Sequence, residues 1–484
     1  MKLSQILSQV KIDYKLPSGF VSEAIDVSSV ELDSRLVRKN SVFFALPGKT
    51  TNGLEFVDSA IKNGASAVIA EGFIESSNPH QLLVEFLQIF YAPRPTNIYA
   101  ITGTNGKTSV AEFTRQILEI SGKKASSIGT LGVMCDSSIE KDLQSFALTT
   151  PDLVSLYKNL QVLKKNGVDD VAIEVSSIGL EQGRIAGLEI EVGAFTNFSQ
   201  DHLDYHKSMA EYLRCKMILF ENTLENGGVA VLNSDIPEFA EIKKICERKK
   251  TRVIEYGFKA RDLRLCKIEP IKNGQKVFFE FEKKNYQFEL SVSGEFQAFN
   301  ALCALGNVLT KNNLDQIPLE KFNILQPAPG RMQRAGTLPN KAQVYIDFAH
   351  TPDALENVLK LAREITKKRV VVLFGCGGDR DAKKRPIMGK LACELSDLVI
   401  VSDDNPRTEK AETIRDEILS ACDMAKTFEL SDRKHAIEKA VQMLEAGDIL
   451  ILAGKGHEKY QIIGATKFEF DEEKIVKNAI AKLT

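Results

Sequence analysis

The chain has 484 residues, of which 43% are hydrophobic and 26% are charged, and these values exclude a disordered or fibrous protein. Its 63 basic and 65 acidic residues leave a net charge of -2, so the overall charge gives no support for binding to nucleic acid or to a membrane surface. At about 100–200 residues per domain, this length predicts about three domains.

The N-terminal residues and the cysteines indicate in which cellular compartment the protein is expected. Residues 1–19 contain no apolar segment of signal-peptide length, and no uninterrupted apolar run approaches the ~20 residues of a membrane span. Eight cysteines are scattered without a C-x-x-C pair, which indicates reduced, mostly buried thiols rather than a disulfide framework or a zinc site. We therefore expect a cytoplasmic, multidomain protein that neither enters a membrane nor binds nucleic acid.

Two proline-containing stretches divide the chain. Residues 92–95, Ala-Pro-Arg-Pro, precede a strand predicted at 97–101, and residues 326–330, Gln-Pro-Ala-Pro-Gly, precede one predicted at 344–346. Because proline restricts its own backbone and that of its neighbour, both stretches suit linkers. Each resulting segment is long enough for a core. The predicted domains are residues 1–94, 95–329 and 330–484.

Short apolar runs alternate with helical patterns in the second and third segments. An amphipathic helix is predicted at 153–163, and strands are predicted at 171–175, 369–374, 398–401 and 449–452. Continuously apolar strands separated by helices are typical of parallel sheets covered on both faces. The predicted fold class is α/β, with an N-terminal α/β domain, a central P-loop-like domain around a parallel sheet and a Rossmann-like C-terminal domain.

The strongest chemical signal is the stretch Ile-Thr-Gly-Thr-Asn-Gly-Lys-Thr-Ser at 101–109, between a predicted strand and a helical pattern. Glycines let backbone N–H groups approach phosphate oxygens, and the helix N-terminus adds partial positive charge. Only two residues separate the glycines, where the general P-loop has four, so a tight turn with an accidental Gly-Lys-Thr is the alternative. The stretch predicts ATP or GTP binding through Gly103, Thr104, Asn105, Gly106, Lys107, Thr108 and Ser109.

Two oxygen-bearing residues predict a magnesium site. The Thr108 hydroxyl follows Lys107, which would reach the terminal phosphates, and Glu174 lies in the apolar strand predicted at 171–175. Open α/β sheets bind ligands at the carboxyl ends of their strands, and a carboxylate there can coordinate Mg²⁺ with the phosphates. The alternative for Glu174 is a strand-end salt bridge.

These motifs and those that follow them resemble the Mur ligases, the ATP-dependent amide-forming enzymes of peptidoglycan synthesis. Their relative folylpolyglutamate synthase shares the loop, but the matching motifs run from Leu32 to Glu458 through all three segments. They are most similar to the ligases that add the third peptide residue to UDP-N-acetylmuramoyl-L-alanyl-D-glutamate. The resemblance implies a monomeric cytoplasmic ligase that joins meso-diaminopimelate to the D-glutamate γ-carboxylate through an acyl phosphate, using ATP and two Mg²⁺ ions.

The UDP-sugar subsite implied by the resemblance spans two segments. Leu-Asp-Ser-Arg at 32–35 and the following stretch 42–48 look like the family's UDP-sugar-binding start, and Thr-Thr-Pro-Asp at 149–152 looks like its sugar-peptide site. The family usually has His after the Ser-Ser pair at 176–177, where this chain has Ile178. The implied contacts are Leu32, Ser34, Lys49, Thr50, Thr51, Thr149, Thr150, Ser176, Gln182 and Arg184.

The family's catalytic residues also have counterparts. Lys216 matches a carbamylated lysine that holds a second Mg²⁺, although the residue pattern alone predicts a lysine on a helix surface. His350 could equally be a buried, hydrogen-bonded loop residue. The implied catalytic residues are Lys107, Glu174, His202, Lys216 and Arg331. The implied metal ligands are Thr108, Glu174, His202 and carbamylated Lys216, and the implied further nucleotide contacts are Asn300, Arg331, Asp347 and His350.

The third segment contains a motif that bears on the choice of amino acid. Asp-Asn-Pro-Arg at 404–407 resembles the motif of diaminopimelate-adding ligases and differs from typical lysine-adding relatives at Arg407. Diaminopimelate is lysine with an extra carboxylate, which Arg407 can bind bidentately, while Glu458 can pair with the distal ammonium. The alternative for Arg407 is an ordinary surface arginine. The implied contacts are Arg380, Asp404, Asn405, Pro406, Arg407, Gly454 and Glu458.

Three other functions stay open from the sequence. A lysine-adding relative would accept lysine, whereas a carboxylate-specific site rejects it because its arginine would be left unpaired. A folylpolyglutamate-synthase-like ligase would bind a folate instead of a UDP-sugar. A non-enzymatic nucleotide-binding module would release no phosphate in response to the two other substrates.

Overall fold

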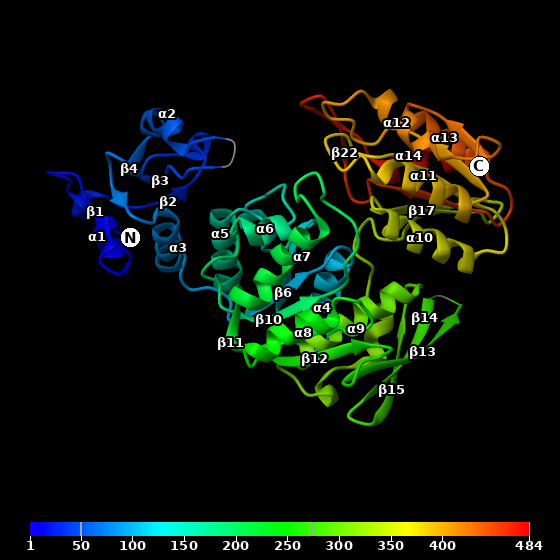
Figure 1. Ribbon diagram of the computed structural model, residues 1–484, viewed down its shortest axis with the longest axis horizontal. Coiled ribbons are helices and arrows are strands. Elements are labelled where there is room, and N and C mark those ends of the chain that lie inside the picture. Colours follow the sequence, from blue (N-terminus) through cyan, green and yellow to red (C-terminus); the bar gives the residue numbers. More distant parts are fainter. Residues whose placement is uncertain (49–50, 273, 484) are drawn as a thin grey trace.

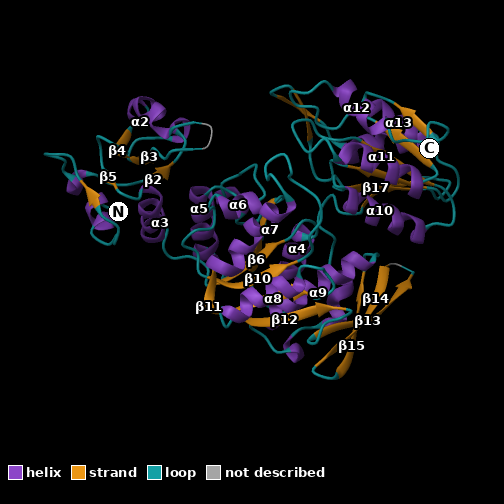
Figure 2. Ribbon diagram, viewed as in Figure 1, coloured by secondary structure: helices purple, strands orange, loops and turns teal. Residues whose placement is uncertain are grey.

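The computed structural model describes residues 1–48, 51–272 and 274–483. Figure 1 shows three lobes that follow one another along the chain, with the two termini at opposite ends of the molecule. Each lobe combines helices and strands, as the colouring of Figure 2 makes clear. The α/β fold class and the three-domain architecture are therefore confirmed, while the boundaries at 94 and 329 stay predictions.

The N-terminal lobe is built on a small parallel sheet. Its order is β2–β3–β4, with β2 at Ser29–Glu31, β3 at Ser41–Phe44 and β4 at Ala65–Ile69. Helix α3 (Pro79–Phe90) packs its buried Leu82, Phe86 and Leu87 into the same apolar cluster as residues of the central lobe. The remaining elements are α1 (Leu3–Leu7), α2 (Val57–Lys62) and the pair β1 (Tyr14–Lys15) and β5 (Glu75–Ser76).

The central lobe contains a ten-stranded sheet of order β15–β14–β13–β12–β11–β10–β6–β9–β7–β8. Its seven parallel strands are β6 (Asn97–Thr102), β7 (Ala125–Gly129), β9 (Asp170–Glu174), β10 (Ile190–Phe195), β11 (Leu224–Asn233), β12 (Arg252–Gly257) and β13 (Leu263–Ile271). The antiparallel additions are β8 (Gly132–Met134), β14 (Gly274–Phe281) and β15 (Lys284–Leu290). The predicted parallel sheet is present, and hairpins that were not predicted extend it at both edges.

Helices cover both faces of the central sheet. One face holds α4 (Lys107–Ile120) and α9 (Glu295–Leu309), whose apolar residues share one buried cluster. The opposite face holds α5 (Leu153–Lys165), α6 (Ser177–Glu181), α7 (Met209–Ile218) and α8 (Phe239–Arg248). Every residue of β9 is buried, which explains its continuous apolar run, since each fully buried Val or Ile contributes ~1.5–3 kcal/mol.

The C-terminal lobe has a six-stranded sheet of order β16–β17–β21–β18–β19–β20, in which only the β16–β17 pair is antiparallel. The strands are β16 (Gln333–Thr337), β17 (Gln343–Asp347), β18 (Val370–Phe374), β19 (Leu398–Val401), β20 (Thr427–Glu429) and β21 (Ile449–Ala453). One face packs against α10 (Pro352–Ile365), α11 (Lys384–Leu395) and α12 (Ala411–Leu419), and the other against α13 (Arg433–Gln442) and α14 (Glu472–Ala481). A hairpin of β22 (Tyr460–Ile463) and β23 (Thr466–Glu469) lies outside this sheet.

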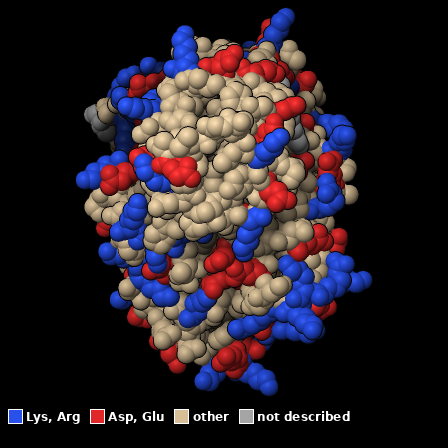
Figure 3. Space-filling view, turned by 90° about the vertical axis from the view of Figure 1, so that its left-hand side faces the viewer, with Lys and Arg blue, Asp and Glu red and all other residues tan. Residues whose placement is uncertain are grey.

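Surface charge and thiols agree with the composition. On the face shown in Figure 3, basic and acidic side chains are interspersed without one sign dominating. None of the eight cysteines, all of which lie among the described residues, forms a disulfide, and five of them are buried. In the described part of the chain, no helix combines the length and the apolar character that crossing a bilayer requires.

Candidate active site

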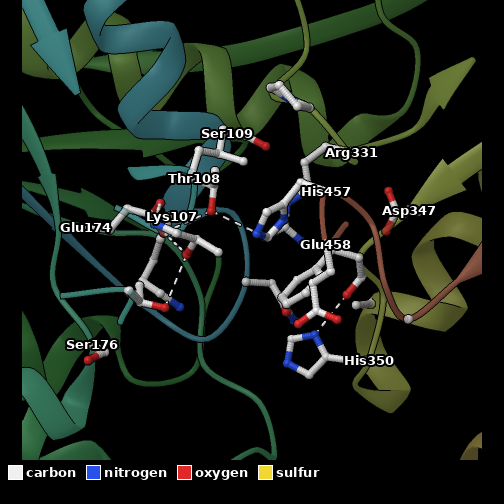
Figure 4. Close-up of a pocket in the computed structure, with 18 of the residues that line it drawn as sticks. Lys107, Thr108, Ser109, Glu174, Ser176, Arg331, Asp347, His350, His457 and Glu458 are labelled. Atoms are coloured by element: carbon white, nitrogen blue, oxygen red, sulfur yellow. Dashed lines mark hydrogen bonds between the residues drawn. The ribbon is translucent and has the colours of Figure 1, made fainter. Parts of the chain in front are cut away.

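A cavity of about 1130 Å³ lies between the central and C-terminal lobes. In Figure 4, Lys107, Thr108 and Glu174 face Arg331, His457 and His350 across it. The cavity brings together most of the residues predicted for nucleotide, metal and amino-acid binding. Those on its wall are Thr104, Asn105, Gly106, Lys107, Thr108, Ser109, Thr149, Glu174, Ser176, His202, Asn300, Arg331, Asp347, His350, Arg380, Asp404, Asn405, Arg407, Gly454 and Glu458.

The phosphate loop has the strand–loop–helix geometry predicted for it. Helix α4 begins at Lys107, and Gly106 precedes it with a φ of 84°, in the left-handed region that favours glycine. A Cβ at Gly106 would lie 2.6 Å from Asn300 Oδ1, so Asn300 packs directly against the loop. Lys107 Nζ donates to the carbonyl oxygens of Gly103 at 3.0 Å and Thr104 at 2.7 Å. The loop therefore holds its lysine where phosphate oxygens would compete for the same N–H groups.

Thr108 and Glu174 meet as the sequence predicted. Thr108 Oγ1 donates to Glu174 Oε2 at 2.9 Å, and the Thr130 backbone N–H donates to Glu174 Oε1 at 2.8 Å. Glu174 is 2% exposed, and this burial raises the pKa of its carboxyl group. Among the described residues no cluster of three His, Cys, Asp or Glu side chains could hold a metal alone. The hydroxyl and carboxylate oxygens nevertheless suit Mg²⁺, a hard cation that usually shares its coordination with phosphates and water.

Lys216 is not the surface lysine that the helical pattern predicted. It is 1% exposed, its Nζ donates to the Gly103 carbonyl at 2.7 Å, and Nζ lies 4.4 Å from the Tyr212 ring centroid. Burial, with the nearby Lys107 charge, lowers the pKa of Lys216 well below its usual value. The correction follows from tertiary packing, because α7 carries Lys216 onto the back of the phosphate loop.

Two histidines and a carboxylate lie beside the loop. His202 Nε2 is 3.3 Å and His350 Nε2 is 3.7 Å from Asp201 Oδ2. Burial lowers the pKa of His202 to about 4, so its ring is neutral at pH 7. Burial would raise the pKa of Asp201, but the neighbouring His202, His350 and Lys384 hold it well below the usual value. His350 is hydrogen-bonded as the alternative proposed, through Nδ1 to the Phe348 carbonyl at 2.8 Å, but it is only half-buried.

The C-terminal lobe reaches the phosphate loop directly. Arg331 Nη2 donates to Thr108 Oγ1 at 3.3 Å, and its guanidinium lies 4.6 Å from the Phe348 ring centroid. Asn105 Nδ2 donates to Asp353 Oδ2 at 2.7 Å. Asp347 accepts the backbone N–H of Met332 at 2.7 Å, which fixes the turn after Arg331. A guanidinium thus approaches the place where terminal phosphates would lie.

A smaller cavity of about 350 Å³ adjoins this site. Its wall includes Asn300, Phe299, Tyr256 and Asn197, a combination of flat rings and amide groups. Such a wall suits a planar heterocycle with hydrogen-bonding edges. Asn300 lines both cavities, so a nucleotide with phosphates on the loop would extend its base toward this second space.

The central residues predicted for the sugar-peptide form one hydrogen-bonded network. Thr150 Oγ1 donates to the Glu174 carbonyl at 3.0 Å and accepts the Ser176 backbone N–H at 2.9 Å. Arg184 Nη1 donates to the Thr150 carbonyl at 2.9 Å, and its Nη2 donates to Gln182 Oε1 at 2.6 Å. Of the residues predicted for the sugar-peptide, Thr149 and Ser176 line the large cavity. Ser176 also caps α6, since its hydroxyl accepts the Gly179 N–H at 3.0 Å.

The N-terminal residues predicted for the UDP end lie away from that cavity. Leu32 packs partly buried against the N-terminal core, and the Ser34 carbonyl accepts from Asn63 Nδ2 at 2.9 Å. Thr51 is exposed, and its carbonyl accepts the Gly48 N–H at 2.9 Å. Lys49 and Thr50 lie outside the described residues. The UDP subsite on these residues therefore stays a prediction.

Arg407 is held in a fixed and unusual conformation. Its φ is 51°, a left-handed value that non-glycine residues rarely adopt, and the β22–β23 hairpin pairs with its backbone. Arg407 N donates to the Ile462 carbonyl at 3.1 Å, and Gly464 N donates to the Arg407 carbonyl at 2.7 Å. Burial, and then the like charge of Arg380, lowers the pKa of Arg407. Two guanidinium groups near one another on a cavity wall suit an anionic ligand between them.

In the same lobe, a buried lysine organises the acidic residues of the pocket. Lys455 is 0% exposed, and its Nζ lies 3.1 Å from Asn405 Oδ1, 3.2 Å from Glu458 Oε2 and 3.5 Å from Asp404 Oδ1. Asn405 Nδ2 donates to Glu458 Oε2 at 2.8 Å. Gly454 has a φ of 114°, and a Cβ there would lie 2.7 Å from Asp404 Oδ2. The backbone at Gly454 must therefore approach this cluster closely.

Some predicted residues do not reach the cavity wall, and some wall residues were missed. Gly103, Lys216 and Pro406 lie behind it, and a Cβ at Gly378 would lie 1.9 Å from the Pro406 carbonyl, so Pro406 packs on that loop. Four residues that line the cavity were not predicted from the sequence: Thr130, Asp201, Lys384 and His457. Asp201 and His457 directly precede the predicted site residues His202 and Glu458, which was the available signal, whereas Thr130 and Lys384 carry none.

Comparison with known proteins covers all three lobes. Residues 26–96 match the Mur ligase family catalytic domain, residues 101–308 the Mur ligase middle domain, and residues 330–456 the Mur ligase glutamate ligase domain. The chain is 40% identical to a UDP-N-acetylmuramoyl-L-alanyl-D-glutamate--2,6-diaminopimelate ligase of Mesorhizobium japonicum, over 99% of each chain. It is 41% identical to the ligase of the same name from Zymomonas mobilis, over 93% of this chain and 94% of the relative.

A solved structure of a UDP-N-acetylmuramoyl-L-alanyl-D-glutamate--2,6-diaminopimelate ligase aligns with 100% of this chain and 99% of its own. The TM-score is 0.67 and the identity is 29%. The order of the three matched regions is the order of the three lobes, and the site lies between the second and third of them. On this evidence the chain belongs to the Mur ligase family.

Proposed function

We propose that this chain is an ATP-dependent ligase that adds meso-diaminopimelate to the γ-carboxylate of D-glutamate in UDP-N-acetylmuramoyl-L-alanyl-D-glutamate. The observation that carries the proposal is the joint placement of two opposed sets of residues on one cavity. The phosphate loop with Glu174 and Arg331 occupies one part of the wall, and Arg407, Arg380 and Glu458 occupy another. Relatives at about 40% identity over nearly the whole chain carry the corresponding name.

The phosphate side of the cavity would activate the γ-carboxylate. Phosphoryl transfer from ATP to that carboxylate gives an acyl phosphate and ADP, and it needs little covalent help from a protein. Lys107 and Arg331 would stabilise the moving negative charge, because both cations already lie within hydrogen-bond distance of loop atoms. Asn300 and the adjoining cavity of about 350 Å³ would take the base.

The other side would present the amine. Arg407 and Arg380 would bind the distal carboxylate of diaminopimelate, and Glu458 and Asp404 would pair with its distal ammonium. The other amine, in its neutral form, attacks the acyl carbon, a C–N bond forms, the C–O bond to phosphate breaks, and one N–H proton is lost. Lysine has no distal carboxylate, so it would offer neither guanidinium group a carboxylate to bind.

The proposal also includes Mg²⁺ ions and a carbamate on Lys216. Thr108 and Glu174 would hold one Mg²⁺, which when bound neutralises charge on the phosphates. His202 and a carbamylated Lys216 would hold a second. Carbamylation requires a neutral amine, and the lowered pKa of Lys216 supports one. Removal of CO₂ from the buffer should lower activity reversibly, and bicarbonate should restore it; indifference to both would contradict the carbamate.

The proposal also covers the binding site for the UDP-sugar, the oligomeric state and the cellular location. Leu32, Ser34, Thr149 and Ser176, with the residues around them, would bind the UDP-sugar. All the proposed subsites lie on one chain, which supports a monomer. Cysteines that form no disulfide among the described residues, together with ATP and a nucleotide sugar as the proposed substrates, support a cytoplasmic location. Light scattering coupled to size-exclusion chromatography tests the monomer, and a stable dimer would contradict it.

A phosphate-release assay tests the proposed function. Phosphate should appear only when ATP, UDP-muramoyl-dipeptide and meso-diaminopimelate are all present. Well-folded protein that releases no phosphate under these conditions would favour a nucleotide-binding module. Phosphate release with a folate substrate in place of the UDP-sugar would favour a folylpolyglutamate-synthase-like ligase.

A further inference from the structure

Lys384 is a buried cation for which the proposed chemistry has no role so far. It is the first residue of α11, it is 5% exposed, and it lines the large cavity between the lobes. The N-terminus of a twelve-residue helix adds partial positive charge at the same place. A lysine so placed adds to a positive potential on the cavity wall.

The ammonium of Lys384 has no protein partner. In residues 1–48, 51–272 and 274–483, no hydrogen bond or ion pair within contact distance joins its Nζ to another group. The buried Lys216 and Lys455 differ, because the first donates to a carbonyl and the second to Asn405 and Glu458. The Lys384 side chain is largely buried, and its ammonium, which has no partner among the described residues, can bind an anion in the cavity that the residue lines.

The described residues around Lys384 do not supply an acceptor for its ammonium. Arg385, the next residue, is paired with Glu409 at 2.9 Å and with Glu417 at 2.8 Å. Lys383, the preceding residue, is exposed. The carboxylate of Asp201 senses Lys384 electrostatically, but its close partners are His202 at 3.3 Å and His350 at 3.7 Å.

Lys384 lies where the two sides of the site meet. Gln200 Nε2 donates to Asp381 Oδ2 at 2.9 Å, and Arg380 Nη1 lies 3.8 Å from Asp204 Oδ2. These contacts join the loop after β10, which carries His202, to the loop before α11, which carries Arg380. A ligand group that passes from the phosphate side to the amino-acid side would run past this junction.

We propose that Lys384 binds an oxyanion of the reacting substrates at the junction of the two lobes. The inference rests on the proposed function, which supplies two sources of such an oxyanion: the carboxylate next to the attacking amine, and an oxygen of the phosphoryl group. Both have the same chemistry, a small anion that accepts hydrogen bonds from an ammonium and from a helix N-terminus.

The test compares Lys384→Met with Lys383→Met, which removes the same charge from the adjacent exposed position. In Lys384→Met the ligand-free protein should have a Tm no lower than that of the wild type, because methionine fills similar volume without an unpaired charge. Its kcat/KM for ligation should fall at least thirtyfold, and Lys384→Arg should recover part of the loss. Lys383→Met should leave both Tm and activity unchanged.

The kinetic pattern identifies the source of the oxyanion. A rise in KM for meso-diaminopimelate at unchanged KM for ATP assigns Lys384 to the amino-acid carboxylate, and a fall in kcat at unchanged KM values assigns it to the phosphoryl group. Ligation by Lys384→Met within threefold of the wild type would overturn the proposal. A variant that fails to fold, or whose Tm falls by several degrees, would overturn it too, because Lys384 would then be structural.

Failure of the proposed function has a different signature. In that case the wild type itself shows no ligation, and inorganic phosphate serves as the probe. Phosphate should then raise the Tm of the wild type and of Lys383→Met more than that of Lys384→Met. An equal rise in all three proteins would overturn the oxyanion site independently of the reaction.

Discussion

The phosphate loop and the amino-acid pocket share one cavity but are built in different ways. The loop belongs to one nine-residue stretch, 101–109, which runs from the end of β6 into the start of α4, and Lys107 donates to two carbonyls of the same stretch. The pocket combines Arg380, Arg407, Gly454 and Glu458 from separate loops, and the buried Lys455 holds its acidic residues together. The first region should therefore determine whether any reaction occurs, and the second which amino acid is used.

The largest expected effect lies in the phosphate loop. Lys107→Ala should lower kcat at least 1000-fold, about 4 kcal/mol of lost transition-state stabilisation, because no other loop residue supplies a cation to the terminal phosphates. Steady-state phosphate release measures it, and the unfolding transition should be retained. The matched variant Lys124→Ala removes an exposed lysine beyond α4 and should change nothing. Activity of Lys107→Ala within threefold of the wild type would refute the role of the loop.

The next effect should be confined to the amino-acid pocket. Arg407→Ala should raise KM for meso-diaminopimelate about 30–100-fold, which corresponds to ~2–3 kcal/mol for a lost charged hydrogen bond, and should leave KM for ATP nearly unchanged. Initial rates with each substrate varied in turn measure the two constants. Arg248→Ala, on the exposed face of α8, is the control. Equal changes in the two constants would mean that the two regions are not separable.

Lys455→Met sharpens the comparison, because it removes the ammonium that holds the acidic residues of the pocket and leaves Arg380 and Arg407 in place. The variant leaves the buried Asp404 and the partly buried Glu458 without their common cation, so unfolding should cost ~3 kcal/mol less and KM for meso-diaminopimelate should rise about tenfold. Thermal unfolding and initial rates measure these effects. A variant as stable as the wild type would show that Lys455 does not organise the acidic residues.

The smallest expected effect is the pH dependence of stability that His202, beside the phosphate loop, causes. Burial lowers the pKa of His202 to about 4 from an ordinary 6.5, so between these values the unfolded chain binds a proton that the folded chain does not. His202 therefore lowers stability progressively as the pH falls from about 6.5 to about 4. His202→Gln should lose Tm less steeply in that window, whereas His80→Gln, at an exposed position, should follow the wild type. Parallel curves for all three proteins would contradict the shifted pKa.

The same contrast explains what could be predicted from the sequence. Lys107 and Thr108 lie in a continuous motif, and the apolar runs at β9, β18 and β21 are buried on both sides, so their patterns are visible locally. Lys216 was predicted on a helix surface because its burial depends on Gly103, 113 positions away in the chain. Lys384 and Thr130 have no sequence signal, since only tertiary packing places them on the cavity. The edge hairpins of the central sheet were missed for the same reason.

The central claim is that the C-terminal pocket selects an amino acid by its distal carboxylate. The most direct measurement is the ratio of kcat/KM for meso-diaminopimelate to that for L-lysine, with ATP and UDP-muramoyl-dipeptide saturating. We predict a ratio above 1000 in the wild type, and a ratio at least tenfold smaller in Arg407→Ala. Comparable use of the two amino acids by the wild type, or an unchanged ratio in the variant, would contradict the account.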